Sequence, residues 1–357
     1  MRPFVYDAQP GRIVFGPGSL GRLKAEVEAL GVRRVLVLST PGQRTFAAAI
    51  ADMLGDLCVG LHDRAVMHVP VETANEGIAE AHRLGADCAL AVGGGSTIGL
   101  AKAIALETGL PVVAVPTTYS GSEMTPIWGL TEGGVKRTGR DRRVLPRTVV
   151  YDPELTVGLP AAVTGPSGMN AIAHCVEALY SETANPVISL MAEEGIRALA
   201  ESLPTAVAKP ADIEARSGAL YGAWLAGAAL GAVGMALHHK LCHTLGGTFD
   251  LPHAEVHTVA IPYVTAFNAE AVPEAIGRVA RALGVEGAGK AAGALFDLAQ
   301  AIGARTSLAE IGMRESDLDH AAEIATRNPY YNPRSVTREG VRALLDDAYF
   351  GRRPASG

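Results

Sequence analysis

The first 155 residues alternate apolar, β-branched runs with segments of helical periodicity, and no other feature constrains the fold as strongly. Strand-like runs occur within 33–40, 82–96, 110–118 and 147–153, and the segment 45–54 has helical spacing. Strands that alternate with helices typically form a parallel sheet covered by those helices. We therefore predict an N-terminal α/β domain with a parallel sheet over residues 1–155.

The character of the sequence changes after Pro160. Residues 161–350 are rich in Ala, Leu and Glu at helical spacing and contain almost no strand-like runs. Pro and Gly punctuate residues 152–160, which is typical of a boundary between domains. We therefore predict an all-α C-terminal domain over residues 156–357.

One uncharged stretch, residues 217–237, is long enough to span a bilayer. Ala and Gly dominate it over Leu, Ile and Phe, and no basic cluster flanks it, which is atypical of a membrane span. We interpret it as a buried central helix, in which Gly218 and Gly222 let neighbouring helices approach closely.

Charge and cysteine content narrow the possible partners. The formal net charge is −6 and the pI is about 5.9, so no excess of basic residues indicates binding to nucleic acid or to an anionic membrane. The four cysteines are scattered, without a CxxC pair or a secretory leader. We expect four free thiols and a cytoplasmic protein.

A glycine-rich turn connects a strand-like run to a helical segment in "ALAVGGGSTIGLAKAIAL", residues 89–106. Gly93, Gly94 and Gly95 let the backbone approach a diphosphate closely, and the N–H groups of the helix start, with Ser96, supply donors. A tight strand-to-helix turn without a ligand is the alternative. The spacing differs from GxGxxG, so an ordinary Rossmann fold is not predicted.

Hydroxyl side chains follow two other strands. Thr117, Thr118 and Ser122 come after the run at 110–118, where they can hold ribose or adenine or merely cap the next element. After the first run stand Ser39 and Thr40, where an acidic residue would repel a 2′-phosphate. We therefore expect NADH or NADPH as cofactor.

Five polar side chains recur in the C-terminal half at helical spacing. Asn170 and His174 lie at i and i+4, His239 and His243 repeat this spacing, and His253 follows a turn. Polar groups beside apolar helices need partners. We predict that one functional pocket gathers these five side chains.

At these residues the chain resembles the iron-containing alcohol dehydrogenase family, whose dehydroquinate synthase-like fold joins a nucleotide-binding α/β domain to a helical domain. The resemblance places the family's metal-binding aspartate and three histidines at Asn170, His174, His239 and His253, with His243 beside the substrate. The amide of Asn170 replaces the expected carboxylate.

Three stretches point to one branch of that family. Gly99 stands where the family's GGGSxxD motif has its acid, and residues 67–72 and 116–141 resemble the same branch. Enzymes of this branch reduce a carbon–carbon double bond conjugated to a ketone in aromatic-compound catabolism. The resemblance implies a homodimer that uses NADH or NADPH on a dicarboxylate substrate, without a required metal.

The chemistry agrees with the loss of the carboxylate. Hydride addition to a conjugated enone produces an enolate that hydrogen-bond donors can stabilise, so a metal is not essential. Without a metal the imidazoles can be charged, and we expect a positively charged pocket for the dianion. His243 is the expected proton donor and His253 the second choice. Three histidines alone can hold zinc, so a metal remains an alternative.

The substrate carboxylates need cationic or hydrogen-bonding partners. Candidates are His238, Lys136, Arg137, Arg327, Tyr330 and Arg334, although solvated surface charge explains any one of them better than substrate binding does. Cys242, beside His243, is expected to pack rather than to act as a nucleophile.

Other activities fit parts of the pattern. A metal-dependent alcohol or polyol dehydrogenase of the same family would oxidise simple alcohols. A lyase resembling dehydroquinate synthase would recycle its nicotinamide cofactor, and a non-catalytic protein would bind nucleotide without turnover.

Overall fold

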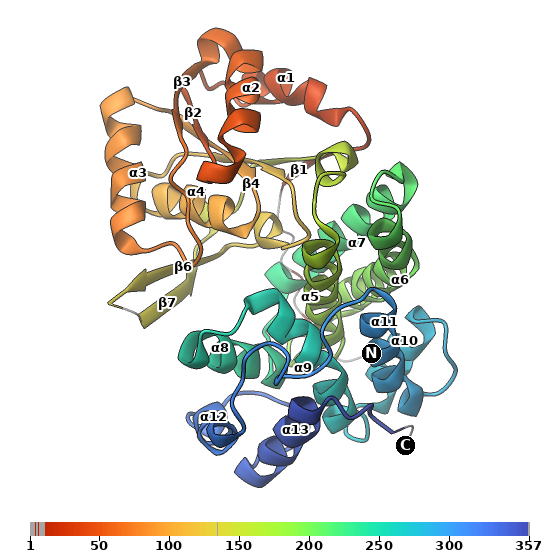
Figure 1. Cartoon of the computed structure of the whole chain (residues 1–357). Coiled ribbons are helices and arrows are strands. Elements are labelled where there is room, and N and C mark those ends of the chain that lie inside the picture. Colours follow the sequence, from red (N-terminus) through yellow and green to blue (C-terminus); the bar gives the residue numbers. More distant parts are fainter. Residues whose placement is uncertain (1–3, 5, 7–10, 134, 356–357) are drawn as a thin grey trace. The chain divides into compact units, whose positions relative to one another are not determined.

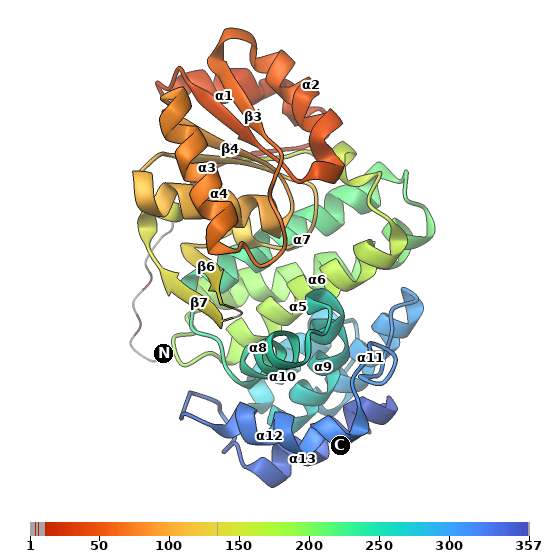
Figure 2. The same ribbon diagram turned by 60° about the vertical axis from the view of Figure 1, so that its left-hand side comes forward.

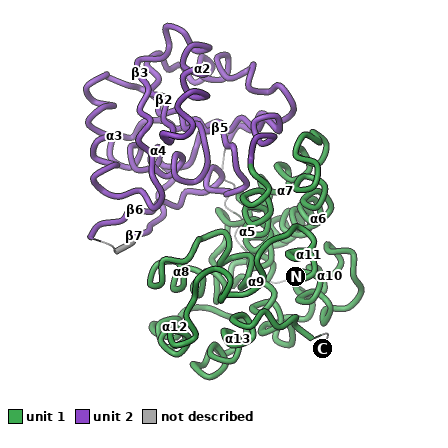
Figure 3. The backbone as a smooth tube through the Cα atoms, in the orientation of Figure 1, with its two compact units in different colours: residues 1–8, 160–357 green, residues 9–159 purple. Residues whose placement is uncertain are grey.

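Figure 1 shows the computed structural model, which describes residues 4, 6, 11–133 and 135–355. The chain divides into two compact units, one with residues 9–159 and the other with residues 1–8 and 160–357 (Figure 3).

A six-stranded sheet forms the centre of the unit 9–159. Its strands lie in the order β1 (Arg12–Phe15), β8 (Thr148–Tyr151), β5 (Val112–Pro116), β4 (Cys88–Gly93), β2 (Val35–Leu38) and β3 (Cys58–His62). Each pair of neighbours is parallel. The predicted parallel sheet is therefore confirmed.

Four α-helices cover the two faces of this sheet: α1 (Leu23–Ala29), α2 (Arg44–Leu54), α3 (Val71–Leu84) and α4 (Gly95–Thr108) (Figure 1). Side chains alternate along each strand, so Val35 and Val37 pack with α1 and α2, while Leu36 and Leu38 pack with α3 and α4. Strands buried on both faces must be apolar throughout, which explains the continuous runs in the sequence.

The order of the strands locates a ligand-binding edge. From β2 the chain moves outward to β3, and then returns to the other side of β2 for β4, β5 and β8. In open parallel sheets, ligands bind at the carboxyl ends of the strands where this direction reverses. Here that point lies between Leu38 and Gly93, the last residues of β2 and β4.

Nine α-helices form the described part of the unit 160–357 (Figure 2): α5 (Ala161–Tyr180), α6 (Pro186–Ala208), α7 (Ile213–Ala232), α8 (Leu237–Phe249), α9 (His253–Asn268), α10 (Pro273–Ala282), α11 (Ala291–Ala301), α12 (Leu318–Thr326) and α13 (Arg338–Phe350). Helix α5 packs against α6, α7 and α9. The predicted helical domain is confirmed.

The uncharged stretch 217–237 is not one helix. Helix α7 ends at Ala232, and α8 begins at Leu237 after a bend of 98°. Among the described helices, no single one is long and apolar enough to cross a membrane, and only this bent pair together meets the criteria of length and composition. Most of α7 is buried, and Gly222 lies so close to α6 that an added Cβ would come within 2.7 Å of Leu199 Cγ.

Gly99 and the segment 67–72 contact each other. A Cβ at Gly99 in α4 would lie 2.8 Å from Val69 Cγ2, so the structure has no room there for the family's acidic side chain. The same segment holds the hairpin of β6 (Ile127–Glu132) and β7 (Val135–Arg140), because Val69 O accepts a hydrogen bond from Thr131 N at 3.1 Å. The three stretches that indicate one branch of the family therefore form one contiguous region of this unit.

We expect the variant Gly99→Ala to lower the free energy of unfolding by about 1–3 kcal/mol, because its Cβ overlaps Val69 in a packed region. Chemical denaturation measures this change. Gly277, in the middle of α10 with no atom within 4 Å of an added Cβ, supplies the matched control, and Gly277→Ala should be neutral or stabilising. The double variant Val69→Ala/Gly99→Ala should recover most of the loss, and a double variant as unstable as Gly99→Ala would contradict the contact.

Candidate active site

The glycine-rich turn lies at the reversal point of the sheet. Gly93 ends β4 with φ of 147°, and an added Cβ would come within 2.6 Å of Gln43 Oε1 and Thr97 Oγ1. At Gly94, which precedes α4 and has no side-chain cap, a Cβ would lie 2.9 Å from Thr118. The turn therefore requires glycine. The first N–H groups of α4 receive no hydrogen bond from a capping side chain and can bind an anion.

Of the hydroxyl side chains predicted to bind the cofactor, some contact the glycine-rich turn and others lie in neighbouring segments. Thr117 N donates to Gly93 O at 3.1 Å, and its hydroxyl accepts from Gln43 Nε2 at 2.9 Å. Ser39 follows β2 and is buried, with no partner for its Oγ among the described residues. Gly95 and Ser96 form the first turn of α4, whereas Ser122 begins a separate 3₁₀ turn.

Lys102 fixes the position of that turn. Its buried ammonium group donates to Ser122 O, Thr125 O, Thr125 Oγ1 and Ile127 O at 2.6–2.9 Å. Burial lowers the pKa of Lys102 to about 7, and the charge of the buried Glu123 opposes this shift. The helix that starts at the glycine turn therefore also holds the segment after β5.

A cluster of six imidazole rings lies in the unit 160–357. The rings come from three helices: His174 from α5, His238, His239 and His243 from α8, and His253 and His257 from α9. Adjacent ring centroids are separated by 4.5–6.3 Å. The structure thus brings the four predicted histidines together and adds His238, predicted only as a substrate ligand, and His257.

Helix periodicity explains how α8 presents its histidines. Leu237, Leu241 and Leu245 follow one another at i+4 and are buried in a core with α9, α12 and α13. At 100° per residue, His239 and His243 fall on the opposite side of the helix from this stripe. The rings of His174, His238, His239 and His257 are buried, whereas His243 is exposed.

A buried carboxylate that sequence reasoning missed belongs to the cluster. Glu177 has no exposed surface, and its Oε2 lies 2.6 Å from His239 Nδ1. Asn170, His174 and Glu177 lie at i, i+4 and i+7 on α5, hence on one face. That spacing was visible in the sequence and could have identified Glu177, just as the i+4 spacing from His253 could have identified His257.

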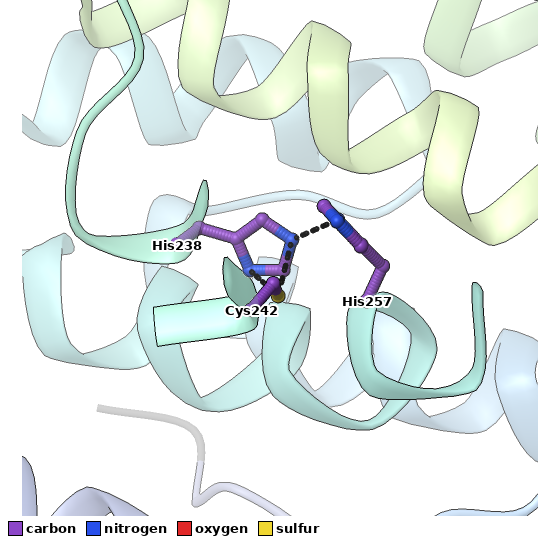
Figure 4. Close-up of side chains that lie close together, drawn as sticks. All are labelled: His238, Cys242 and His257. Carbon is purple, nitrogen blue, oxygen red and sulfur yellow. Dashed lines mark hydrogen bonds between the residues drawn. The ribbon is translucent and has the colours of Figure 1, made fainter. Parts of the chain in front are cut away.

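His238, Cys242 and His257 lie close together and are fully buried (Figure 4). His238 Nε2 and His257 Nδ1 are 2.8 Å apart, and Cys242 Sγ lies 3.6 Å from His238 Nε2. Two nitrogen ligands of tetrahedral zinc are about 3.3 Å apart. The two rings are therefore a hydrogen-bonded pair, and burial raises the pKa of the Cys242 thiol, which agrees with a packing role.

The expectation of a positively charged pocket is wrong for three of the rings. Burial, and then the charges of neighbouring histidines, hold the pKa values of His174, His238 and His257 well below the usual 6.5. These rings are neutral at pH 7. The composition of the sequence did not show how completely they are buried.

Four buried polar atoms of the cluster have no partner among the described residues: Asn170 Oδ1, His174 Nδ1, His239 Nε2 and His257 Nε2. A buried polar atom without a hydrogen bond is costly, and in functional sites a ligand or water commonly supplies the missing partner. These four atoms are therefore candidate partners for a ligand or a water.

The residues at the family's metal-binding positions lack the carboxylate that the resemblance leads us to expect among the metal ligands. Asn170 supplies a neutral amide, and the carboxylate of α5, Glu177, is engaged by N–H donors. Among the described residues, three potential ligand atoms lie within 4.8 Å of one another only in the group of His238, Cys242 and His257, which is not the family's set.

The predicted carboxylate-binding residues have other partners. Arg137, on β7, pairs with Glu132 at 3.1 Å, and Arg327 pairs with Glu323 at 2.5 Å. The Tyr330 hydroxyl donates to Ala325 O at 3.0 Å, and burial raises its pKa to about 12. Arg334 donates to Phe267 O. The side chain of Lys136 lies outside the described residues.

Comparisons with known proteins give consistent results. The family "Iron-containing alcohol dehydrogenase" matches residues 10–153, and "Fe-containing alcohol dehydrogenase family, C-terminal" matches residues 164–349. The maleylacetate reductase of Burkholderia cepacia is 58% identical over 99% of this chain and 100% of its own length, and that of Sphingobium indicum is 56% identical over 98% and 99%.

Solved structures extend this similarity to the fold. The maleylacetate reductase of Rhizobium sp. strain MTP-10005 superposes with a TM-score of 0.96 at 51% identity, covering 99% of this chain and all of the other. A 1,3-propanediol oxidoreductase superposes with a TM-score of 0.91 at 30% identity, covering 98% of this chain and all of its own.

The low pKa values of the buried histidines predict how stability changes with pH. The unfolded chain takes up protons near pH 6.5 that the folded chain does not, so stability is lost as pH falls below about 6.5.

Each such histidine contributes about 1.4 kcal/mol per pH unit to the slope of the free energy of unfolding against pH. In denaturation between pH 7.5 and 5, His257→Leu should flatten the slope by about this amount. The control Val259→Ala changes a buried side chain of the same helix that does not titrate, so it should lower stability and leave the slope unchanged. Equal slopes for His257→Leu and the unmodified protein would contradict the assignment.

Proposed function

The chain belongs to the iron-containing alcohol dehydrogenase family, and we infer that it is an NAD(P)H-dependent oxidoreductase that reduces the carbon–carbon double bond of maleylacetate to give 3-oxoadipate. One observation carries this inference: eight curated relatives named maleylacetate reductase match the chain over nearly its full length at 50–58% identity. These relatives have the activity of the branch that Gly99 and its contacting segments indicate.

The reaction balances with one hydride and one proton. The hydride leaves C4 of the reduced nicotinamide and forms a bond with the alkene carbon β to the ketone. The electron pair of the double bond moves to the ketone oxygen as an enolate, which then takes a proton at the α carbon. The products are NAD(P)⁺ and 3-oxoadipate.

The histidine cluster supplies the groups that the enolate needs. Neutral imidazoles in a buried site can donate hydrogen bonds to a developing negative charge, and burial strengthens such bonds. His243 is the proposed proton donor, because its exposed ring lies 6.3 Å from that of His239 and can exchange protons with solvent. His253 is the second choice.

A metal is not part of the proposed mechanism. The amide of Asn170 and the engaged carboxylate of Glu177 support this view, as does the chemistry of the enone, which spreads the developing charge over a conjugated system. The neutral amide also adds no negative charge to that of Glu177 beside a dianionic substrate.

Assembly, cofactor choice and location are further proposals. We propose a homodimer in the cytoplasm that accepts NADH or NADPH. Four free cysteines fit a reducing compartment, and Ser39 and Thr40 present no acid to a 2′-phosphate.

The direct test is the loss of nicotinamide absorbance on addition of maleylacetate, with simple ketones as a comparison. We expect turnover with NADH and with NADPH, and full activity after chelation and removal of bound metal. Oxidation of simple alcohols that depends on added iron or zinc, without reduction of maleylacetate, would favour a metal-dependent alcohol dehydrogenase instead.

Replacing Asn170 with the aspartate expected from the family should turn the site into one that binds zinc. We expect Asn170→Asp to bind zinc at least about tenfold more tightly, because a carboxylate joins the imidazoles as a ligand. The same change should raise KM for maleylacetate, since the new charge repels a dianion. Metal analysis after equilibrium dialysis and steady-state kinetics measure the two effects. The control Asn170→Ala removes the amide without adding charge and should gain no zinc, so equal zinc binding by both variants would contradict the role of position 170.

A further inference from the structure

Helix α8 begins without a capping side chain of its own. Its N-cap residue is Ala236, which has no side chain that can accept a hydrogen bond and is the last residue of the break 233–236 after α7. The first N–H groups of any α-helix lack partners within the helix and need acceptors from elsewhere. For α8 the acceptor comes from a different helix.

Glu177 of α5 supplies that acceptor. Its Oε1 accepts from His238 N at 2.7 Å, and its Oε2 accepts from Ala236 N at 3.1 Å and from His239 N at 3.3 Å. The same end of α5 holds the break itself, because Ser181 Oγ donates to Gly234 O at 2.7 Å. The start of α8 is therefore tied to α5 at two points.

The same carboxylate also contacts an imidazole. Glu177 Oε2 lies 2.6 Å from His239 Nδ1, in addition to its contacts with backbone N–H groups. Backbone N–H groups can only donate, so both carboxylate oxygens act as acceptors, and Nδ1 of His239 must carry the hydrogen in this contact. Nε2, which has no partner among the described residues, is then the atom that meets a ligand.

The other buried rings lack such a contact. His238 and His257 bond to each other, and His174 Nδ1 has no partner among the described residues. A neutral imidazole has one N–H, and its place depends on the partner of the ring. Among these rings, only that of His239 meets a carboxylate.

We propose that Glu177 is a positioning residue of the active site: it caps α8 from α5 and fixes both the orientation and the Nδ1–H tautomer of His239. Its carboxylate thus orders a histidine at a position where the family binds metal. The effect of Glu177 on kcat rests on the proposed reductase activity, whereas the tautomer of His239 and the cap of α8 do not.

The test compares three variants of the full-length protein. Glu177→Leu removes both acceptor oxygens. Glu177→Gln keeps one, which can still accept from His239 Nδ1. Asp152→Leu is the matched control, because Asp152 is also a buried carboxylate that accepts three backbone N–H bonds, from Gly18, Leu20 and Glu154, far in sequence from any histidine of the cluster.

The kinetic expectation separates positioning from stability. Glu177→Leu should lower kcat by about 10–100-fold, as loss of a partner that orients a ligand-binding histidine commonly does, and should leave KM for NADH unchanged. Glu177→Gln should recover part of kcat. Asp152→Leu should lower the melting temperature at least as much as Glu177→Leu while kcat of the folded protein stays near that of the unmodified enzyme. Equal kcat for Glu177→Leu and Asp152→Leu would overturn the proposal.

A spectroscopic measurement does not depend on the substrate. In protein labelled with ¹⁵N in its histidine rings, the His239 signals, assigned by their loss in His239→Gln, should show a protonated Nδ1. Glu177→Leu should change this pattern, and Glu177→Gln should preserve it. An unchanged His239 pattern in Glu177→Leu would overturn the proposal even if the enzyme reduces maleylacetate, and a changed pattern would support it even if maleylacetate is not the substrate.

Discussion

The geometry of the histidine cluster depends on the buried carboxylate of Glu177. Its two oxygens accept hydrogen bonds from the first backbone N–H groups of α8 and from the ring of His239. Because α8 starts where α5 presents these acceptors, the bend of 98° after α7 and the direction of the α8 histidines have one common origin. A helix that began one residue earlier or later would turn its rings by about 100° and disperse the cluster.

The electrostatics of the site follow from burial rather than from the number of histidines. Six rings close together suggest a strongly positive pocket, but desolvation holds the pKa values of three of them well below the usual 6.5. Neutral imidazoles with defined hydrogen positions suit an enolate, whose charge is delocalised and needs directed donors more than a dication. The amide of Asn170 is consistent with this arrangement, because it adds no negative charge among these neutral rings.

Local patterns in the sequence predicted the features that depend on the spacing of neighbouring residues. Alternating strand and helix runs identified the parallel sheet, and i, i+4 spacing grouped the predicted histidines. Glu177 carries the same spacing from Asn170, but one carboxylate in an apolar helix does not show which distant N–H groups it will meet. The contact of Gly99 with Val69 joins residues thirty positions apart, and the neutral state of His257 depends on burial by other helices, so neither follows from local pattern.

In the proposed site, the carboxylate of α5 orders the histidines instead of helping them to hold a metal. Anomalous X-ray scattering at the iron and zinc edges, from crystals of active enzyme with bound maleylacetate and without reduced nicotinamide, tests it most directly. We expect no anomalous peak among Asn170, His174, His239 and His253, and a substrate oxygen or a water within hydrogen-bond distance of His239 Nε2. A full-occupancy metal ion bound by these residues and touching the substrate would contradict it.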